Sequence, residues 1–223
     1  MTEPTQRRRR QPFVLLILNC QRYKDKALRQ KNTWLKEIPT DLCYYHVQGN
    51  PDLPVDFVFK ESESFLTVRS PDDYLSLPDK MVRALAAIHA VLDYDYVFKT
   101  DDDQRLKDAS FFQDLMARLS PPRAAAHYGG NIIHVKQPYL SQYYRIHPEL
   151  PTYLPILATR YCSGRFYFLS HHAVSDLLTK ETREKIRQHC LEDYAIGYHL
   201  SERYKTPTAL MSIATDAVFE DDL

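Results

Sequence analysis

Glycine is scarce in this sequence, since only 5 of the 223 residues are glycine. Because glycine permits unusual backbone angles and close approach, each retained glycine marks a position that needs a reason. The five are Gly49, Gly129, Gly130, Gly164 and Gly197. Two interpretations stay open for Gly129-Gly130 and for Gly164: backbone that approaches a bound ligand, or tight turns alone.

Cysteine pairs and glycosylation signals are missing as well. The four cysteines, Cys20, Cys43, Cys162 and Cys190, form no Cys-x-x-Cys pair, which argues against a zinc knuckle. They fit either four buried thiols or two disulfides. No Asn-x-Ser or Asn-x-Thr sequence occurs, and this absence favours a chain that never enters the secretory pathway.

Neither a long hydrophobic run nor an excess of charge is present. The run 13–18 is too short to span a bilayer or to serve as a signal peptide, although arginines precede it. We therefore expect no membrane span. Lys and Arg together number 29, as do Asp and Glu, so net charge offers no case for nucleic acid binding. Residues 1–11 are polar and arginine-rich, which predicts a disordered basic tail.

What the sequence does contain is enough apolar material for a folded core. Hydrophobic residues make up 44% and aromatic residues 12%, and residues 12–223 suit one α/β domain. Apolar patterning predicts strands over 13–18, 42–47, 56–60 and 96–98, and helices over 23–36, 78–92 and 112–119. This alternation predicts a largely parallel central sheet with helices on its faces.

The second half of the chain is less regular. A glycine turn at 128–130 leads into a strand, and residues 136–155 form a long loop, with a short antiparallel strand, of the kind that often binds a ligand. An aromatic strand covers 166–169, Ser170 can cap the helix that follows, and another helix begins at Leu191. The last residues, 219–223, are mostly acidic and predict a mobile tail.

The stretch that organises the chain is the apolar run 96–98, closely followed by Asp101, Asp102 and Asp103. Alternation along an extended segment places Asp101 and Asp103 on one side and Asp102 on the other. Neighbouring carboxylates repel unless a cation neutralises them, and oxygen ligands suit Mg²⁺ or Mn²⁺. Open α/β sheets also bind ligands at the carboxyl ends of their strands. The competing interpretation is a solvated acidic turn that caps the next helix.

A second acidic pair, Glu192-Asp193, opens a predicted helix. A carboxylate there acts either as a general base for a hydroxyl group or simply as a helix cap. Neighbours on a helix point about 100° apart, so only one of the two can face a site well. Lys80 and Lys99 also have two interpretations, as basic contacts to a nucleotide or as structural ion-pair partners.

Five segments, in one order along the chain, resemble one family. They are Ala27-Leu28-Arg29-Gln30-Lys31-Asn32-Thr33-Trp34, Asp72-x-Tyr74-x-x-Leu77-x-x-Lys80, Tyr96-Val97-Phe98-Lys99-Thr100-Asp101-Asp102-Asp103, Tyr161-Cys162-Ser163-Gly164-Arg165-Phe166-Tyr167-Phe168-Leu169-Ser170 and Leu191-Glu192-Asp193-Tyr194-Ala195-Ile196-Gly197. The set is similar to motifs of the β1,3-galactosyltransferases and β1,3-N-acetylglucosaminyltransferases, with the fringe enzymes as more distant relatives.

This resemblance implies a GT-A type glycosyltransferase fold and an inverting transfer that depends on Mn²⁺ (or Mg²⁺). A UDP-sugar would be the donor and a glycan hydroxyl the acceptor. The implied site residues are Asp101 and Asp103 for the metal, Asp101, Asp102, Lys80, Arg29 and Gly164 for the donor, and Asp193, rather than Glu192, as the general base. The late histidine that completes the metal site of relatives has no clear counterpart, and His199 and Asp216 are the candidates.

Other functions stay open at this point. A metal-dependent nucleotidyltransferase or phosphohydrolase would need further carboxylates at the site, and a non-catalytic sugar-binding module would keep the fold without the chemistry. The missing anchor and glycosylation sites predict a soluble cytoplasmic enzyme, viral or bacterial, or else the excised catalytic domain of a Golgi-type enzyme. Neither the transferred sugar nor the acceptor can be read from the sequence.

Overall fold

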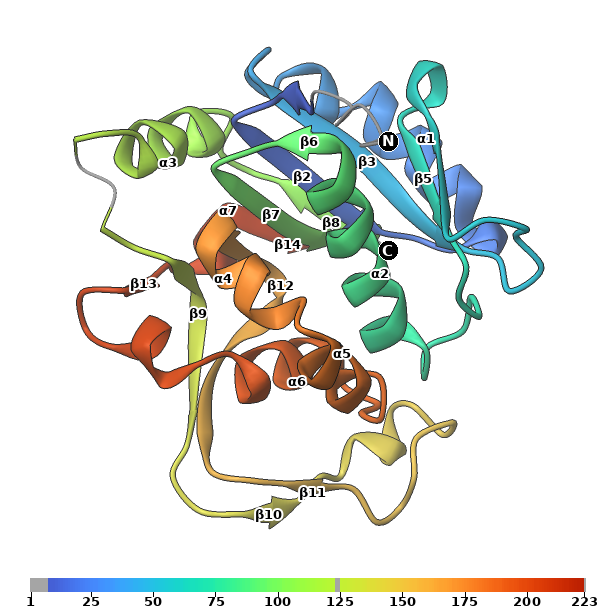
Figure 1. Cartoon of the computed structure of the whole chain (residues 1–223), viewed down its shortest axis with the longest axis vertical. Coiled ribbons are helices and arrows are strands. Elements are labelled where there is room, and N and C mark those ends of the chain that lie inside the picture. Colours follow the sequence, from blue (N-terminus) through green and yellow to red (C-terminus); the bar gives the residue numbers. More distant parts are fainter. Residues whose placement is uncertain (1–7, 123–124, 223) are drawn as a thin grey trace, which may run out of the picture.

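An eight-stranded mixed sheet forms the centre of the molecule (Figure 1). The structure is a computed structural model and describes residues 8–122 and 125–222. In spatial order the strands are β13 (Leu210–Ser212), β9 (Tyr128–Val135), β12 (Thr159–Ser170), β7 (Tyr96–Asp101), β2 (Phe13–Leu18), β3 (Leu42–Gly49), β5 (Phe65–Val68) and β4 (Phe57–Lys60). β2 is parallel to both β7 and β3, and β3 is parallel to β5, whereas β12 is antiparallel to β7 and β9. The predicted α/β class with a largely parallel sheet is confirmed.

β2 shows why an unbroken apolar run predicts a central strand. All six of its residues are buried. Val14, Leu16 and Leu18 join a hydrophobic cluster on one face of the sheet, and the alternate residues join a cluster on the other. A strand covered on both faces has no polar side, so the usual alternation of polar and apolar residues disappears.

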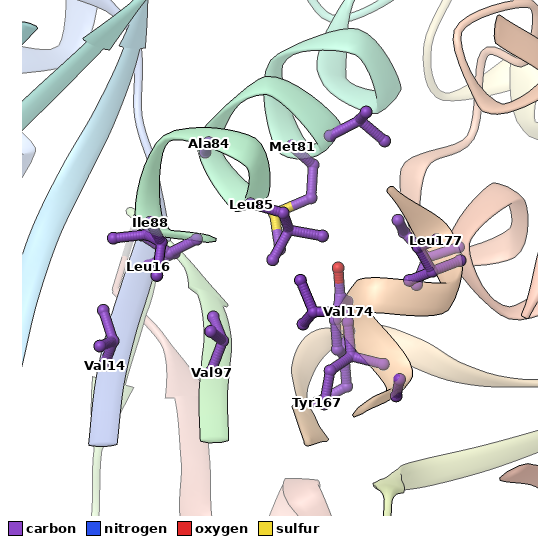
Figure 2. Close-up of a cluster of buried hydrophobic side chains, with 14 of the residues drawn as sticks. Val14, Leu16, Met81, Ala84, Leu85, Ile88, Val97, Tyr167, Val174 and Leu177 are labelled. Atoms are coloured by element: carbon purple, nitrogen blue, oxygen red, sulfur yellow. The ribbon is translucent and has the colours of Figure 1, made fainter. Parts of the chain in front are cut away.

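Four helices cover the first of these faces: α2 (Leu77–Val91), α4 (His171–Leu177), α5 (Lys180–Ile186) and α6 (Glu192–His199). Figure 2 shows Ile88 of α2 beside Leu16 of β2, and Leu85 of the same helix above Val174 of α4. The helical spacing of these apolar residues is the pattern from which α2 was predicted. Ser170 caps α4 as expected, since its Oγ accepts a hydrogen bond from Ala173 N at 3.2 Å.

The opposite face is packed mainly with aromatic rings. α3 (Phe111–Leu119) lies against it, as does the 3-10 turn Trp34–Lys36 that follows α1 (Lys24–Asn32). Phe219 is fully buried in this cluster, with its ring centroid 5.4 Å from that of Phe166. It belongs to β14 (Phe219–Asp221), which pairs antiparallel with β8 (Gln104–Leu106). The prediction of a mobile acidic tail is therefore wrong for residues 219–222, because a buried ring and a strand ladder hold them; Leu223 lies outside the described residues.

The amino-terminal arginines also differ from expectation. β1 (Arg9–Arg10) pairs in parallel with β6 (Leu92–Asp93). Arg9 donates to the Tyr45 hydroxyl at 2.7 Å, and the Arg10 guanidinium lies 2.5 Å from Asp95 Oδ2. The predicted disordered tail is thus wrong for Arg9 and Arg10, because a short ladder and ion pairs hold them, and residues 1–7 of that prediction lie outside the described residues.

Several helices and strands differ in their bounds from the prediction. The helix predicted over 23–36 is divided between α1 and the 3-10 turn after it, and β5 was not anticipated. The long loop carries the antiparallel pair β10 (Tyr139–Leu140) and β11 (Pro155–Ile156). The remaining short elements are the 3-10 turns Gln21–Tyr23, Glu61–Glu63, Tyr143–Arg145 and Glu202–Lys205, and α7 (Thr215–Val218). In the part of the chain that the structure describes, no helix combines the length and apolarity needed to cross a bilayer.

Candidate active site

The acidic run lies where two parallel strands end side by side. β2 and β7 are paired with Leu18 opposite Asp101, so the residues after both strands meet at one edge of the sheet. Asn19 follows β2 there, and Asp102 and Asp103 follow β7. The Asn19 side chain donates to Asp102 Oδ2 at 2.7 Å, which holds this carboxylate against the neighbouring strand. The acidic run therefore occupies the carboxyl edge of the sheet, where open α/β folds bind their ligands.

Lys99 is the buried cation of the site. Only 2% of its side chain is exposed, and its Nζ lies 2.8 Å from Asp101 Oδ1 and 3.2 Å from Glu192 Oε2. It also donates to the backbone carbonyl of Gly164 at 2.7 Å. An ammonium group removed from water needs such partners, because an unpaired buried charge is strongly unfavourable. Although burial alone would lower the pKa of Lys99, the carboxylates of Asp101 and Glu192 hold it above its usual value.

Two carboxyl groups of the acidic run have raised pKa values. Burial raises the pKa of Asp101 to about 7, and the charge of Asp103 adds to the shift, while Lys99 opposes it. Burial likewise raises the pKa of Asp102 to about 6, against the effect of Lys26, whose Nζ lies 3.6 Å from Asp102 Oδ1. Asp101 and Asp102 thus contact different cations on different elements. The raised values mean that these cations do not fully offset the burial of so much negative charge.

Glu192 and Asp193, the first two residues of α6, have different partners. Glu192 is buried and bonds to Lys99 and to the hydroxyl of Tyr167. Asp193 Oδ2 instead accepts a hydrogen bond from the backbone N–H of Gly164 at 2.8 Å. Burial raises the pKa of Asp193 above the usual aspartate value, although Lys99 and backbone hydrogen bonds oppose the shift. Glu192 is therefore committed to an internal ion pair, whereas Asp193 is held by hydrogen bonds from the backbone N–H groups of Gly164 and Tyr194.

Gly164 joins the two halves of the site. Its carbonyl accepts from Lys99, and its N–H donates to Asp193. A β-carbon at this position would lie 3.4 Å from Lys99 Nζ and 3.5 Å from Asp193 Oδ2. A small side chain would fit there, but it would stand between the cation and the carboxylate. The structure thus brings together three of the predicted site residues, Asp101, Gly164 and Asp193.

Two further predicted donor-binding side chains make ion pairs. Lys80 is buried, and its Nζ lies 2.6 Å from Asp72 Oδ1 and 3.0 Å from the Asn19 carbonyl oxygen. It therefore ties the loop before α2 to the end of β2. Arg29 is exposed on α1, with its guanidinium 3.4 Å from Asp222 Oδ1. A role of Lys80 or Arg29 in donor binding stays a prediction.

The two candidates for a third metal ligand also have partners of their own. His199 Nε2 lies 2.9 Å from His189 Nε2, and Asp216 Oδ1 lies 3.5 Å from Arg165 Nε. Within residues 8–122 and 125–222, no group of three or more His, Cys, Asp or Glu side chains is arranged to hold a metal ion. A cation at the acidic run would therefore take part of its coordination shell from a bound ligand or from water.

Residues 51–208 match the family model described as Galactosyltransferase, and this segment is well over half of the chain. The chain belongs to the galactosyltransferase family. The resemblance found in the sequence is thereby confirmed. The matched segment includes β7 with its acidic run, Gly164 and Asp193, whereas β2, α1 and β14 lie outside it.

Comparison with other proteins adds little to this family assignment. No curated protein matches the chain. One similar solved structure is mouse xyloside xylosyltransferase 1 in its apo form, with 10% identity, coverage of 92% of this chain and 85% of that one, and a TM-score of 0.41. Another is a glycosyltransferase involved in the glycosylation of the major capsid of PBCV-1, with 8% identity, coverage of 91% and 82%, and a TM-score of 0.46. A third is the galactosyltransferase LgtC with donor and acceptor sugar analogs, with 10% identity, coverage of 89% and 72%, and a TM-score of 0.46. Because these TM-scores lie below 0.5, we rest no argument on them.

Gln30 is a residue near the acidic run that the sequence analysis did not single out. It is fully buried, and its Nε2 donates to the carbonyls of Asp101 at 3.1 Å and Gln104 at 2.9 Å. Its Oε1 lies 3.0 Å from His46 Nε2. Gln30 therefore holds the backbone at both ends of the acidic run. The sequence held one signal for this role. Gln30 comes three residues after Ala27, on the buried face of α1, where a polar side chain must find hydrogen-bond partners.

Residues of β14 and the position after it bring two more acids to the acidic run. The backbone N–H of Asp222 donates to the carbonyl of Asp103 at 2.7 Å. Gln104 Nε2 lies 3.0 Å from both Asp103 Oδ1 and Asp221 Oδ1. Because 117 positions separate Gln104 from Asp221, no local pattern in the sequence announces this contact.

Two cavities lie near the end of β2. One, of about 270 Å³, is lined by residues of α1, β3, β4 and β5, among them Lys24, Lys31 and Lys60. Gln48 lines the same cavity and donates to Asn19 Oδ1 at 3.0 Å, which connects it to the acidic run. A second cavity, of about 400 Å³, is lined by residues 21–22, 49–52 and 72. The first cavity therefore has three lysines and one acid, Glu63, in its lining, whereas the second has Arg22 with Asp52 and Asp72.

Proposed function

We propose that this chain catalyses an inverting, metal-dependent transfer of a sugar from a UDP-sugar to a glycan hydroxyl, forming a β-linkage. The observation that carries the proposal is the connected set Asp101, Lys99, Gly164 and Asp193. One end is an acidic strand terminus suited to a donor's diphosphate, and the other is a separately anchored carboxylate suited to an acceptor's hydroxyl. Sugar transfer needs both features in a fixed relation. Membership of the galactosyltransferase family supports a nucleotide-sugar donor.

The residues at the strand end fit a divalent cation. The acidic run 101–103 carries three carboxylates and pairs with two lysines, Lys26 and Lys99. Lys99 also pairs with Glu192. The raised pKa of Asp101 and the oxygen-only donor set agree with Mn²⁺ or Mg²⁺. Asp103 together with Asp101 would hold the ion. When bound, it supplies positive charge that offsets the charge developing on the departing diphosphate.

The protein's own residues account for the acceptor half of the reaction. Asp193 takes the proton from the acceptor hydroxyl while that oxygen attacks the anomeric carbon. Its raised pKa makes it a stronger base than an exposed aspartate, and the Gly164 N–H sets its direction. Because the attacking oxygen enters on the face opposite the leaving diphosphate, the configuration at the anomeric carbon inverts. Asp102, which accepts a hydrogen bond from Asn19, would in addition accept hydrogen bonds from donor hydroxyls.

A donor screen with two variants tests the proposed activity. Hydrolysis of UDP-, GDP- and dTDP-sugars is measured with Mn²⁺, together with transfer to a set of methyl pyranosides. Asp193→Asn should still bind Mn²⁺ and UDP but should lose transfer by about 10²- to 10⁴-fold, the range for a general base. Asp103→Asn should lose metal-dependent nucleotide binding.

The control is Asp114→Asn, which changes an exposed carboxylate on α3 and should leave both properties intact. Transfer by Asp193→Asn at the unchanged rate would remove that residue from the mechanism. Absence of Mn²⁺-dependent turnover with every nucleotide sugar would refute the activity itself.

A further inference from the structure

His147 is stacked between two tyrosine rings that come from different loops. Its ring centroid lies 4.2 Å from that of Tyr74, with 13° between the planes, and 6.2 Å from that of Tyr143, with 5° between the planes. Tyr74 belongs to the loop before α2, whereas Tyr143 and His147 belong to the long segment 136–158. Three nearly parallel rings, which we call the ring stack, therefore hold this segment against the loop before α2.

The ring stack lies beside the proposed base. The segment 136–158 is attached to α6, since Leu157 N donates to the Tyr194 hydroxyl at 3.0 Å, and Tyr194 directly follows Asp193. Burial raises the pKa of Tyr74, and the charges of Asp193 and the Tyr143 hydroxyl add to this shift. The other end of the stack is tied to the edge of the sheet that carries the acidic run, since Tyr74 follows Asp72 by two residues. Asp72 Oδ1 lies 2.6 Å from Lys80 Nζ, which donates to the Asn19 carbonyl at 3.0 Å.

Tyr161 gives a second indication of the same neighbourhood. Its ring packs edge-on against Tyr194, with centroids 5.7 Å apart. Its pKa is raised by burial first and then by the charges of Asp193, Tyr139 and Tyr143. Tyr139 and Tyr143 are respectively 50% and 52% exposed. Half-exposed aromatic rings, for which core packing does not account, therefore lie on the segment that Tyr194 of α6 holds.

Part of the Tyr143 ring is free for a ligand. His147 lies nearly parallel to it at a centroid distance of 6.2 Å, and 52% of Tyr143 remains exposed. A general base must lie within hydrogen-bond reach of the hydroxyl that it deprotonates, so the acceptor ring must lie within about one sugar's width of Asp193. An aromatic face is apolar and rigid, and it matches the C–H face of a pyranose. In a galacto-configured ring, H3, H4 and H5 all lie on one face, which makes that face the most apolar.

We infer that Tyr143 is the platform of the acceptor subsite, where it stacks on the C–H face of a galacto-configured β-pyranoside whose hydroxyl reaches Asp193. His147 and Tyr74 are positioning residues, because they hold the Tyr143 ring in place from behind. This inference rests on the proposed sugar transfer and names the class of acceptor for it.

Saturation-transfer NMR tests the platform without any turnover. The probe is methyl β-D-galactopyranoside, added to the protein with Mn²⁺ and UDP, and the protein's aromatic protons are saturated. We expect transfer to H3, H4 and H5 of the sugar, and loss of that transfer in Tyr143→Ala. Methyl α-D-mannopyranoside, whose axial oxygens interrupt both ring faces, should show weaker transfer.

The matched control is Tyr153→Ala. Tyr153 is on the same segment and is 72% exposed, and among the described residues it stacks on no other ring. In kinetic assays Tyr143→Ala should raise the acceptor KM by about tenfold, the loss expected for one aromatic contact. Tyr143→Phe, which keeps the ring, should stay within about twofold, and so should Tyr153→Ala.

Two results would overturn the inference: no saturation of the galactoside by the unchanged protein, or equal saturation by Tyr143→Ala. An effect of Tyr153→Ala as large as that of Tyr143→Ala would also overturn it, because it would show only that the segment had been loosened. Failure of the proposed activity gives a different result, namely no hydrolysis of any nucleotide sugar while sugar binding at Tyr143 persists.

Discussion

At the scale of single residues, Lys99 decides the geometry of the site. Its ammonium group contacts Asp101 on β7 and Glu192 on α6, and it lies 5.8 Å from the ring centroid of Tyr167 on β12. One buried charge therefore sets the spacing between the strand end that would meet the donor and the helix that carries Asp193. Buried ion pairs contribute little net stability, so the value of Lys99 lies in this positioning.

Burial of the Asp101 carboxyl group makes the stability of the fold depend on pH. The folded-state pKa of Asp101, about 7, lies above the value of 3.8 for an unperturbed aspartate. A raised carboxyl pKa contributes stability that is present below the unfolded value and is lost as pH rises through the folded value. The site therefore opposes folding most above about pH 7, which is where a bound cation would offset the charge.

The raised pKa of Asp193 predicts the pH dependence of transfer. A general base acts only when ionised, so the rate should fall as pH drops through the pKa of Asp193, at a higher pH than for an ordinary aspartate. Below that pKa, kcat for transfer should fall about tenfold per pH unit. The measurement is a pH profile of transfer with saturating donor, beside a profile of UDP binding with Mn²⁺.

These two profiles separate the base from the acidic run. Protonation of Asp193 lowers transfer and leaves UDP binding intact, whereas protonation of the run 101–103 weakens UDP binding. A transfer rate that stays level down to the ordinary aspartate range would contradict the assignment of Asp193.

At the scale of elements, β14 is the part of the molecule that links the core to the site. Phe219 enters the aromatic cluster beside Phe166, and two residues later Asp221 contacts Gln104 next to the acidic run. Asp221 also forms an ion pair with Arg165 at 2.9 Å. The ring anchors the strand, and the strand places the acids. The acidic composition of the last residues does not predict this strand. Burial of the Phe219 ring stabilises the strand more than hydration of the neighbouring acids favours a mobile tail.

Two substitutions within β14 should differ sharply in their effect on stability. Phe219→Ala leaves a cavity in the aromatic cluster and should lower the free energy of unfolding by about 3–5 kcal/mol. Glu220→Ala removes only an exposed ion pair with Arg105 and should cost at most about 1 kcal/mol. Urea denaturation of both variants, followed by tryptophan fluorescence of the neighbouring Trp34, measures the difference. Similar losses for the two variants would mean that β14 is not anchored through Phe219.

At the scale of the whole molecule, the site is assembled from segments that are far apart in the chain. The end of β2 supplies Asn19, the end of β7 the acidic run, β12 Gly164, α6 Asp193 and β14 Asp221. The family match covers residues 51–208 and so contains only the middle of this assembly. The described residues hold no complete three-residue metal group. A bound donor or water would therefore complete the coordination of a cation.

If protein and nucleotide each supply ligands to the cation, metal and nucleotide should bind cooperatively. Mn²⁺ should bind weakly to the protein alone and at least about tenfold more tightly when UDP is present, because the phosphates supply the missing oxygen ligands. Titration of free Mn²⁺, followed by electron paramagnetic resonance, measures both affinities without turnover. Asp103→Asn should abolish the difference. Equally tight binding of Mn²⁺ with and without UDP would show a complete protein site instead.

Local patterns allowed several features to be predicted from the sequence. The buried run 13–18, the helical spacing around Leu85 and the cap at Ser170 are each set by neighbours within a few residues, and the structure confirms them. Gln30, the partners of Lys99 and the strand at Phe219 depend on chain segments distant in sequence. The sequence therefore left Lys99 open between two roles and assigned the last residues to a mobile tail.

Hydrophobic periodicity and the order of short motifs determined the fold class, the family and the candidate residues, because these depend on composition and spacing along one chain. Only the tertiary structure decided which candidates meet: Glu192 turns toward Lys99 while Asp193 is held by Gly164, and Asp221 reaches the acidic run. The physical reason is that burial and ion pairing are set by whatever surrounds a side chain in space. For these residues the surroundings come from other strands and helices.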